Sequence, residues 1–193
     1  MYPTGKYKFA VRFKFDIKLY SSKTFLKGEG PERGMLYCNF ENEVDDPYHV
    51  FLTKYFKDRS SWLYYIEVIN GGHGAHIETP NGSITIRAIE HVRLYEFKYL
   101  DNLYMWMGEN YHTNVTLYHN IEPALMRLHK VGEFNLNEYE IFKRGTVSIT
   151  NEYLHLSSLV IATAFAVYKM ELKQVSYKNT AAENIKDLSS SLH

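Results

Sequence analysis

Hydrophobic and charged residues alternate strictly between Lys6 and Tyr20. Hydrophobic side chains occupy every second position, at Tyr7, Phe9, Val11, Phe13, Phe15, Ile17 and Leu19. Successive side chains of a strand point to opposite faces of a sheet, so this period of two predicts a long strand with one buried face.

Short hydrophobic runs separated by polar or glycine-containing breaks continue as far as Ile149. The clearest turn between two runs is Pro80-Asn81-Gly82, because Asn-Gly supplies the positive φ angles of a tight hairpin. No helical pattern lies between the runs, which disfavours a parallel α/β sheet. About ten to twelve strands are predicted, in an antiparallel meander that closes into a barrel or a sandwich. The runs after the first strand are Met35–Phe40, Tyr48–Phe56, Trp62–Ile69, His76–Thr79, Ser83–Ile89, Arg93–Tyr99, Leu103–Met107, Asn114–Tyr118, Leu125–His129 and Tyr139–Ile149.

The pattern changes after Asn151. Residues Tyr153–Tyr168 carry no charge and are rich in alanine, which predicts a helix over about 152–170. Its apolar residues fall on all sides, so it must be surrounded by other elements. At ~1.5 Å per residue, this segment covers about 24 Å, short of the ~30 Å hydrocarbon layer, so a buried helix is favoured over a membrane anchor. Residues 174–193 are polar and are expected to form a disordered tail.

Composition supports one β domain, which we assign to residues 1–173. The chain has 193 residues, of which 16% are aromatic, and aromatic side chains favour strands. Basic and acidic residues balance at 22 each, so an electrostatic partner would have to bind a local patch. We expect no nucleic-acid partner.

Cysteine content and the N-terminal segment indicate a reducing compartment. Cys38 is the sole cysteine, so no intrachain disulfide can form. The first residues lack the uncharged apolar core of a secretory signal. We therefore expect a cytoplasmic protein that is at most peripheral at membranes.

Five basic residues share the solvent face of the first predicted strand and are called the basic stripe here. Asp16 interrupts this face. Such a stripe can bind anionic lipid headgroups, at about 1 kcal/mol for each basic residue. The other interpretation is that its lysines guard an edge strand against pairing with a second chain. The stripe consists of Lys6, Lys8, Arg12, Lys14 and Lys18.

Histidines and glycines give no recognisable chemical site. His73 and His76 are the closest pair among nine histidines, but a glycine-rich loop fixes no ligand geometry and no third ligand is placed by spacing. His112, His119 and His129 can meet only through folding. Neither a nucleophile elbow nor a phosphate loop is present. The sequence predicts no catalytic residue, no metal and no cofactor.

The order of elements resembles the tubby C-terminal-like superfamily, which includes tubby domains, phospholipid scramblases and LURP-one-related proteins. The resemblance is sharpest between Arg93 and Met170 and is to small fungal members. It implies a closed barrel wrapped around a hydrophobic helix, and tubby domains bind phosphoinositides. No lipid-site motif can be matched residue by residue. The segments that carry the resemblance are Tyr95–Tyr99, Leu103–Trp106, Asn114–Tyr118, Gly145–Ile149 and Leu154–Ala164.

We therefore predict a mainly β domain, a closed antiparallel barrel of about twelve strands around a C-terminal helix. Its predicted function is non-enzymatic and intracellular, the binding of anionic phospholipid through the basic stripe, without a transmembrane segment. One alternative is a protein-interaction or regulatory module with no lipid role. Another is an enzyme with a site in the barrel mouth.

Overall fold

The computed structural model describes residues 9–18, 23–29, 35–40, 50–53, 62–79, 82–89, 92–108, 114–139 and 142–190. Side chains are described for 64–79, 82–89, 92–108, 114–135 and 146–174. The described parts contain twelve strands. They are β1 (Phe9–Lys18), β2 (Lys23–Glu29), β3 (Met35–Phe40), β4 (Val50–Thr53), β5 (Trp62–Ile69), β6 (Gly74–Thr79), β7 (Gly82–Ile89), β8 (Leu94–Tyr99), β9 (Asn102–Gly108), β10 (Asn114–Glu122), β11 (Arg127–Tyr139) and β12 (Phe142–Thr150).

The strands form an antiparallel sheet in which each strand pairs with its neighbour in sequence. β1 pairs with β2 on one side and with β12 on the other. The predicted hairpin at Gly82 is present, and Gly82 has a φ of 135°, which glycine adopts without strain. The prediction of a mainly β, antiparallel fold followed by one C-terminal helix is confirmed.

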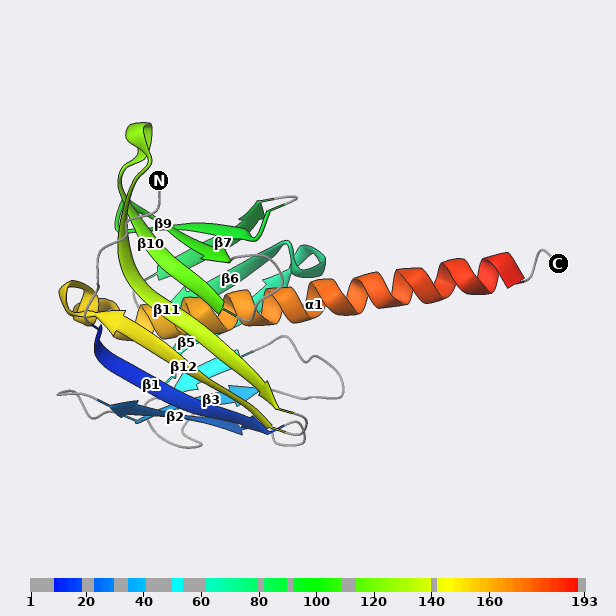
Figure 1. The fold of residues 1–193 in the computed structure, drawn as a ribbon, viewed down its shortest axis with the longest axis horizontal. Coiled ribbons are helices and arrows are strands. Elements are labelled where there is room, and N and C mark those ends of the chain that lie inside the picture. The colour runs from blue at the N-terminus through cyan, green and yellow to red at the C-terminus, as the bar shows by residue number, and fades with distance from the viewer. Residues whose placement is uncertain are drawn as a thin grey trace.

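The helical segment differs from its prediction at both ends. Residues Asn151–Leu156 form a 3-10 turn, η4, and the α-helix α1 runs from Ser157 to Ser190. The helix therefore begins later than residue 152 and includes most of the segment expected to be a disordered tail. A helix that is already nucleated extends at low cost through good helix formers, and Ala181, Ala182 and Glu183 are such residues. Figure 1 shows the first half of α1 among the strands and its second half extending away from them.

The first half of α1 is buried on all sides, as its apolar pattern predicts. Every residue from Leu159 to Tyr168 is buried. Its one polar group deep in the core, the Thr163 hydroxyl, accepts a hydrogen bond from the indole of Trp106 at 3.0 Å and lies 3.2 Å from the carbonyl of Val160. Strand residues pack around the helix, among them Ile66, Ile77, Ile86, Phe134 and Ile149.

The segment Asn151–Gln174 is long and apolar enough to cross a membrane, with a mean hydropathy of 1.2 in its most apolar window. However, 72% of that window is buried inside the protein. A mostly buried core helix passes the same length and hydropathy test as a membrane span. The segment is thus no evidence for a membrane span.

The helix defines two ends of the sheet. At the entry end, β12 passes into η4, and β1 begins there because Phe9 pairs with Thr150. The β8–β9 turn and the turn between β10 and β11 share this end, since Leu103 pairs with Asn120. At the exit end, α1 leaves the strands beside the 3-10 turn η2 (Asn70–Gly72).

Candidate functional site

A chain of hydrogen bonds links two histidines through one tyrosine at the entry end. His119 of β10 and His129 of β11 are cross-strand partners, and η4 places the Tyr153 hydroxyl between them. The Tyr153 oxygen lies 2.9 Å from Nδ1 of His119 and 3.1 Å from Nδ1 of His129. Nδ1 of His129 is also 3.4 Å from a carboxylate oxygen of Glu152.

The network fixes the direction of these hydrogen bonds. The Asn102 side-chain amide donates to the carbonyl of Leu100 at 2.9 Å, so its oxygen faces Nε2 of His119, 3.2 Å away. Nε2 of His119 therefore carries the proton, and its Nδ1 accepts from the Tyr153 hydroxyl. The Tyr153 oxygen then accepts from Nδ1–H of His129.

Burial and charge bias His119 toward its neutral form. Burial, and then the nearby His129, lower the pKa of His119 below its usual value. The ring of Tyr104 stacks on His119 at a centroid distance of 4.8 Å, and burial raises the pKa of the Tyr104 hydroxyl. The neutral form of His119 therefore fits the hydrogen bonds that hold η4.

Large apolar side chains are exposed beside this cluster. Leu100 lies in the β8–β9 turn, and Ile121, Leu125 and Met126 surround the turn between β10 and β11, which includes the 3-10 turn η3 (Pro123–Leu125). We call these four residues the apolar rim. Their exposed fractions range from 47% to 75%. Figure 1 shows the β10–β11 turn projecting beyond the neighbouring strands.

Two of the rim residues adopt backbone angles that non-glycine residues rarely take. Leu100 has a φ of 47° and Met126 a φ of 50°, both in the left-handed region. Asn or Gly is the usual choice for such positions. The entry end therefore presents leucine and methionine where turn geometry alone favours a small or polar residue.

The basic stripe follows β1, which begins at this same end. Lys6 and Lys8 lie outside the described residues. Arg12, Lys14 and Lys18 take the register positions opposite Ser148, Thr146 and Phe142 of β12. Phe13 is opposite the fully buried Val147, so Arg12 and Lys14 occupy positions of the other face of β1.

β1 is paired on both of its sides. A strand with two partners offers no open edge for its lysines to guard.

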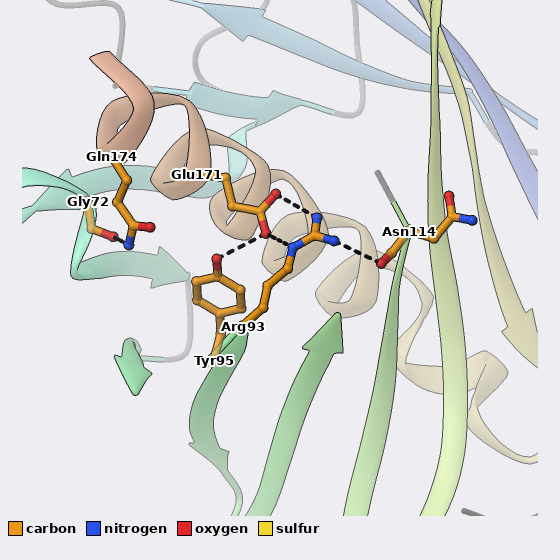
Figure 2. A network of polar contacts seen from close by, with 6 residues as sticks. All are labelled: Gly72, Arg93, Tyr95, Asn114, Glu171 and Gln174. Carbon is orange, nitrogen blue, oxygen red and sulfur yellow. Dashed lines mark hydrogen bonds and ion pairs between the residues drawn. The ribbon is translucent and has the colours of Figure 1, made fainter. Parts of the chain in front are cut away.

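A second polar network holds the helix at the exit end (Figure 2). The Arg93 guanidinium donates to both carboxylate oxygens of Glu171, at 2.6 and 2.8 Å, and the Tyr95 hydroxyl donates to the same carboxylate at 3.0 Å. Burial raises the pKa of the Tyr95 hydroxyl, and the Glu171 charge raises it further. One turn along α1, Gln174 donates to the carbonyl of Gly72 at 2.8 Å.

Close packing reinforces this exit network. A side chain at position 108 would bring its Cβ within 2.5 Å of Cδ of Arg93, and one at position 72 within 2.6 Å of the carbonyl of Met170. Gly72 also has a φ of 95°. The two glycines therefore leave the space in which Arg93 and the helix backbone lie.

The other histidine pair considered in the sequence analysis is His73 and His76. His73 is exposed at the end of η2, and His76 is half-buried in β6. Within the parts of the chain that the structure describes, no three His, Cys, Asp or Glu side chains are grouped so that they could hold a metal.

Comparison with known proteins gives no relative. No protein-family model, no curated protein and no solved structure matches this chain.

Sequence reasoning missed the cluster around Tyr153. The predicted strands ended at Tyr118 and began again at Leu125, which left His119 in a loop. The structure extends β10 to Glu122 and places a three-residue turn at Pro123–Leu125. His119 and His129 are equally distant from the middle of that turn, so a correctly placed turn would have paired them.

Proposed function

We propose that this chain is a non-enzymatic binding domain that contacts anionic phospholipid through the basic stripe, on a closed barrel of twelve strands of the tubby type. It would act in the cytoplasm, at the surface of membranes. The observation that carries the proposal is the pairing of β1 on both sides, because it removes the edge-guarding explanation of the stripe.

The buried helix favours surface binding over chemistry in an interior cavity. Ala162, Ala164 and Phe165 have no exposed surface, and their neighbours on the strands are buried as well. A β-barrel usually binds a small ligand in its interior. Here that space is occupied by α1, so a ligand would have to bind outside the barrel.

The charge pattern favours an anionic surface as the ligand. The whole chain is neutral, so long-range attraction must come from a local group of like charges. Arg12 and Lys14 occupy alternate positions of one strand, about 6.6 Å apart along it, which suits several headgroups of a lipid surface. Each basic residue near such a surface contributes about 1 kcal/mol.

A protein-interaction module is the second candidate, and the apolar rim favours it. Exposed apolar residues that gather at one end of a protein mark contact sites for proteins as well as for membranes. In that case the stripe would be irrelevant to binding.

Vesicle co-sedimentation tests the lipid proposal. The wild-type protein should pellet with vesicles that contain phosphatidylserine or phosphoinositide, and hardly at all with pure phosphatidylcholine. Binding should weaken as salt is added, because salt screens exposed charges. The double variant Arg12→Glu/Lys14→Glu should bind at least about thirty-fold more weakly, from about 1 kcal/mol for each charge removed and a further repulsion.

The matched control reverses two exposed charges on other strands. Arg87→Glu/Lys98→Glu changes the net charge by the same amount on β7 and β8 and should bind within about three-fold of wild type if the site is local. Circular dichroism verifies that both variants fold. Equal, negligible pelleting of wild type and the β1 variant would exclude the lipid function and leave the protein-interaction candidate. Equal, substantial pelleting would exclude the stripe as the binding site.

A further inference from the structure

We infer that the apolar rim inserts into the acyl layer of the membrane to which the basic stripe binds. This inference rests on the proposed function. It adds a second, apolar contact and fixes the orientation of the domain, with the entry end toward the bilayer.

The rim residues lie at one end because hydrogen bonds connect the two turns that carry them. Asn102 donates to the carbonyl of Leu100 in the β8–β9 turn, and the same side chain accepts from His119 of β10. His119 lies two residues before Ile121, where the β10–β11 hairpin begins to project. The two turns are therefore braced against each other and would meet a flat surface together.

The strand β1, which carries Arg12 and Lys14, begins at the same end of the sheet. Phe9 pairs with Thr150, the last residue before η4, so β1 starts beside the segment that holds Tyr153. A surface that covers the rim therefore also approaches the first residues of β1. Basic residues next to exposed apolar ones are the combination that binds anionic bilayers, by charge attraction and by burial of apolar area.

The charges on the projecting hairpin do not oppose this approach. Glu122 and Arg127 face each other across its base at 3.9 Å, so the hairpin carries no net charge from this pair. The tip between them consists of Pro123, Ala124, Leu125 and Met126, which are all exposed and uncharged.

The backbone of the rim supports a functional origin for its apolar residues. Leu100 and Met126 hold left-handed conformations that cost a non-glycine residue free energy. The two-residue β8–β9 hairpin requires the left-handed angles, but an exposed apolar side chain at such a position has no benefit for folding. Insertion into lipid would supply the benefit, because each side chain would leave water.

Tryptophan fluorescence tests insertion directly. Leu125→Trp places a reporter at the tip, where the side chain is 72% exposed, and Val92→Trp places one at a 58% exposed position between β7 and β8, at the exit end. Difference spectra against wild type remove the signal of the two native tryptophans. With phosphatidylserine-containing vesicles, the Leu125→Trp emission should shift to the blue and be quenched by brominated acyl chains. The Val92→Trp emission should do neither.

Binding strength gives the second measurement. Leu125→Ser should weaken vesicle binding about ten-fold, because it replaces an apolar side chain that would leave water on insertion with a polar one. Val92→Ser should bind like wild type. Both positions are exposed, so neither variant should change the melting temperature noticeably.

The outcomes separate this inference from the proposed function. If wild type binds anionic vesicles but Leu125→Trp behaves like Val92→Trp, insertion is excluded and the stripe function stands. If Leu125→Trp shifts equally with neutral vesicles and the Arg12→Glu/Lys14→Glu variant still binds, insertion stands and the stripe function is excluded. If wild type binds no vesicles, both are excluded.

Discussion

The two ends of the buried helix are held by different chemistry. At the exit end, an ion pair between Arg93 and Glu171 connects α1 to the start of β8. The packing there is so close that a Cβ at position 72 or 108 would collide with the helix backbone or with Arg93. At the entry end, hydrogen bonds from two histidines to the Tyr153 hydroxyl group hold the short turn η4. Despite its burial, the pKa of Arg93 at the exit end is raised by its hydrogen bonds to Glu171, whereas burial lowers the pKa of His119 at the entry end.

The two ends of the helix also differ in side-chain exposure and in backbone strain. The exit network is half-buried and lies among residues that pack against the helix. The entry end carries the exposed apolar rim and three left-handed non-glycine residues, Leu100, Asp101 and Met126, whereas the exit end has one among the described residues, Asn70. This contrast indicates that the exit end serves stability, while the entry end retains features that folding does not require.

The largest expected effect is at the exit end, in the variant Glu171→Ala. It leaves the Arg93 guanidinium half-buried without its carboxylate and removes the acceptor of the Tyr95 hydroxyl. We expect a loss of about 2–3 kcal/mol in the free energy of unfolding, measured by urea denaturation.

The control for this variant is Glu96→Ala. It removes the partner of Arg87, whose side chain is 72% exposed, and should cost less than about 1 kcal/mol. If the two variants lose equal stability, the exit network is no stronger than an ordinary surface pair.

A smaller effect is expected at the entry end, when the pH is lowered. The folded-state pKa of His119 lies below its unfolded value, so the unfolded state binds the proton more readily. The stabilising contribution of this group is therefore complete above about pH 6.5 and is lost as the pH falls through the folded pKa. The physical reason is that protonated Nδ1 would face the Tyr153 hydroxyl as a second donor.

The free energy of unfolding, measured between pH 8 and pH 5, tests whether stability falls on acidification. His119→Asn should flatten the decline of stability on acidification, whereas His73→Asn, at an exposed position, should leave the wild-type slope in place. A wild-type protein that becomes more stable on acidification would show that the sign is wrong.

The sequence predicted the strands and the apolar helix because both depend on local periodicity. The alternation in β1 and the uncharged Tyr153–Tyr168 segment identify their elements without any tertiary contact. The predicted C-terminal end of the helix was wrong because the polar residues 174–193 were taken to indicate disorder. Residues 175–190 have adequate helix propensity and extend a helix that the core has already nucleated.

The two polar networks could not be predicted, because their members meet only through register. Arg93 and Glu171 are 78 residues apart, and their contact depends on how far α1 passes between the strands. The Tyr153 cluster depends on the exact position of the β10–β11 turn, and a shift of one residue would turn His119 to the opposite face. The basic stripe was visible in the sequence, but the register in which β1 pairs with β12 was not.

The smallest expected effect concerns the strain at the entry end, in the variant Leu100→Asn. Asparagine tolerates the left-handed conformation that Leu100 holds, so the variant should be more stable by about 0.5–1 kcal/mol in urea denaturation. It should also bind anionic vesicles more weakly, because it removes one residue of the apolar rim.

Leu125→Asn is the matched control, since Leu125 is equally exposed but its φ is not positive. It should lose vesicle binding to a similar degree without gaining stability. A gain in stability for Leu100→Asn alone, with weaker binding in both variants, would mean that leucine is kept in the β8–β9 turn at a cost to folding. Equal stability of the two variants would remove strain from the comparison and leave exposure and the chemistry of the helix contacts as the differences between the two ends.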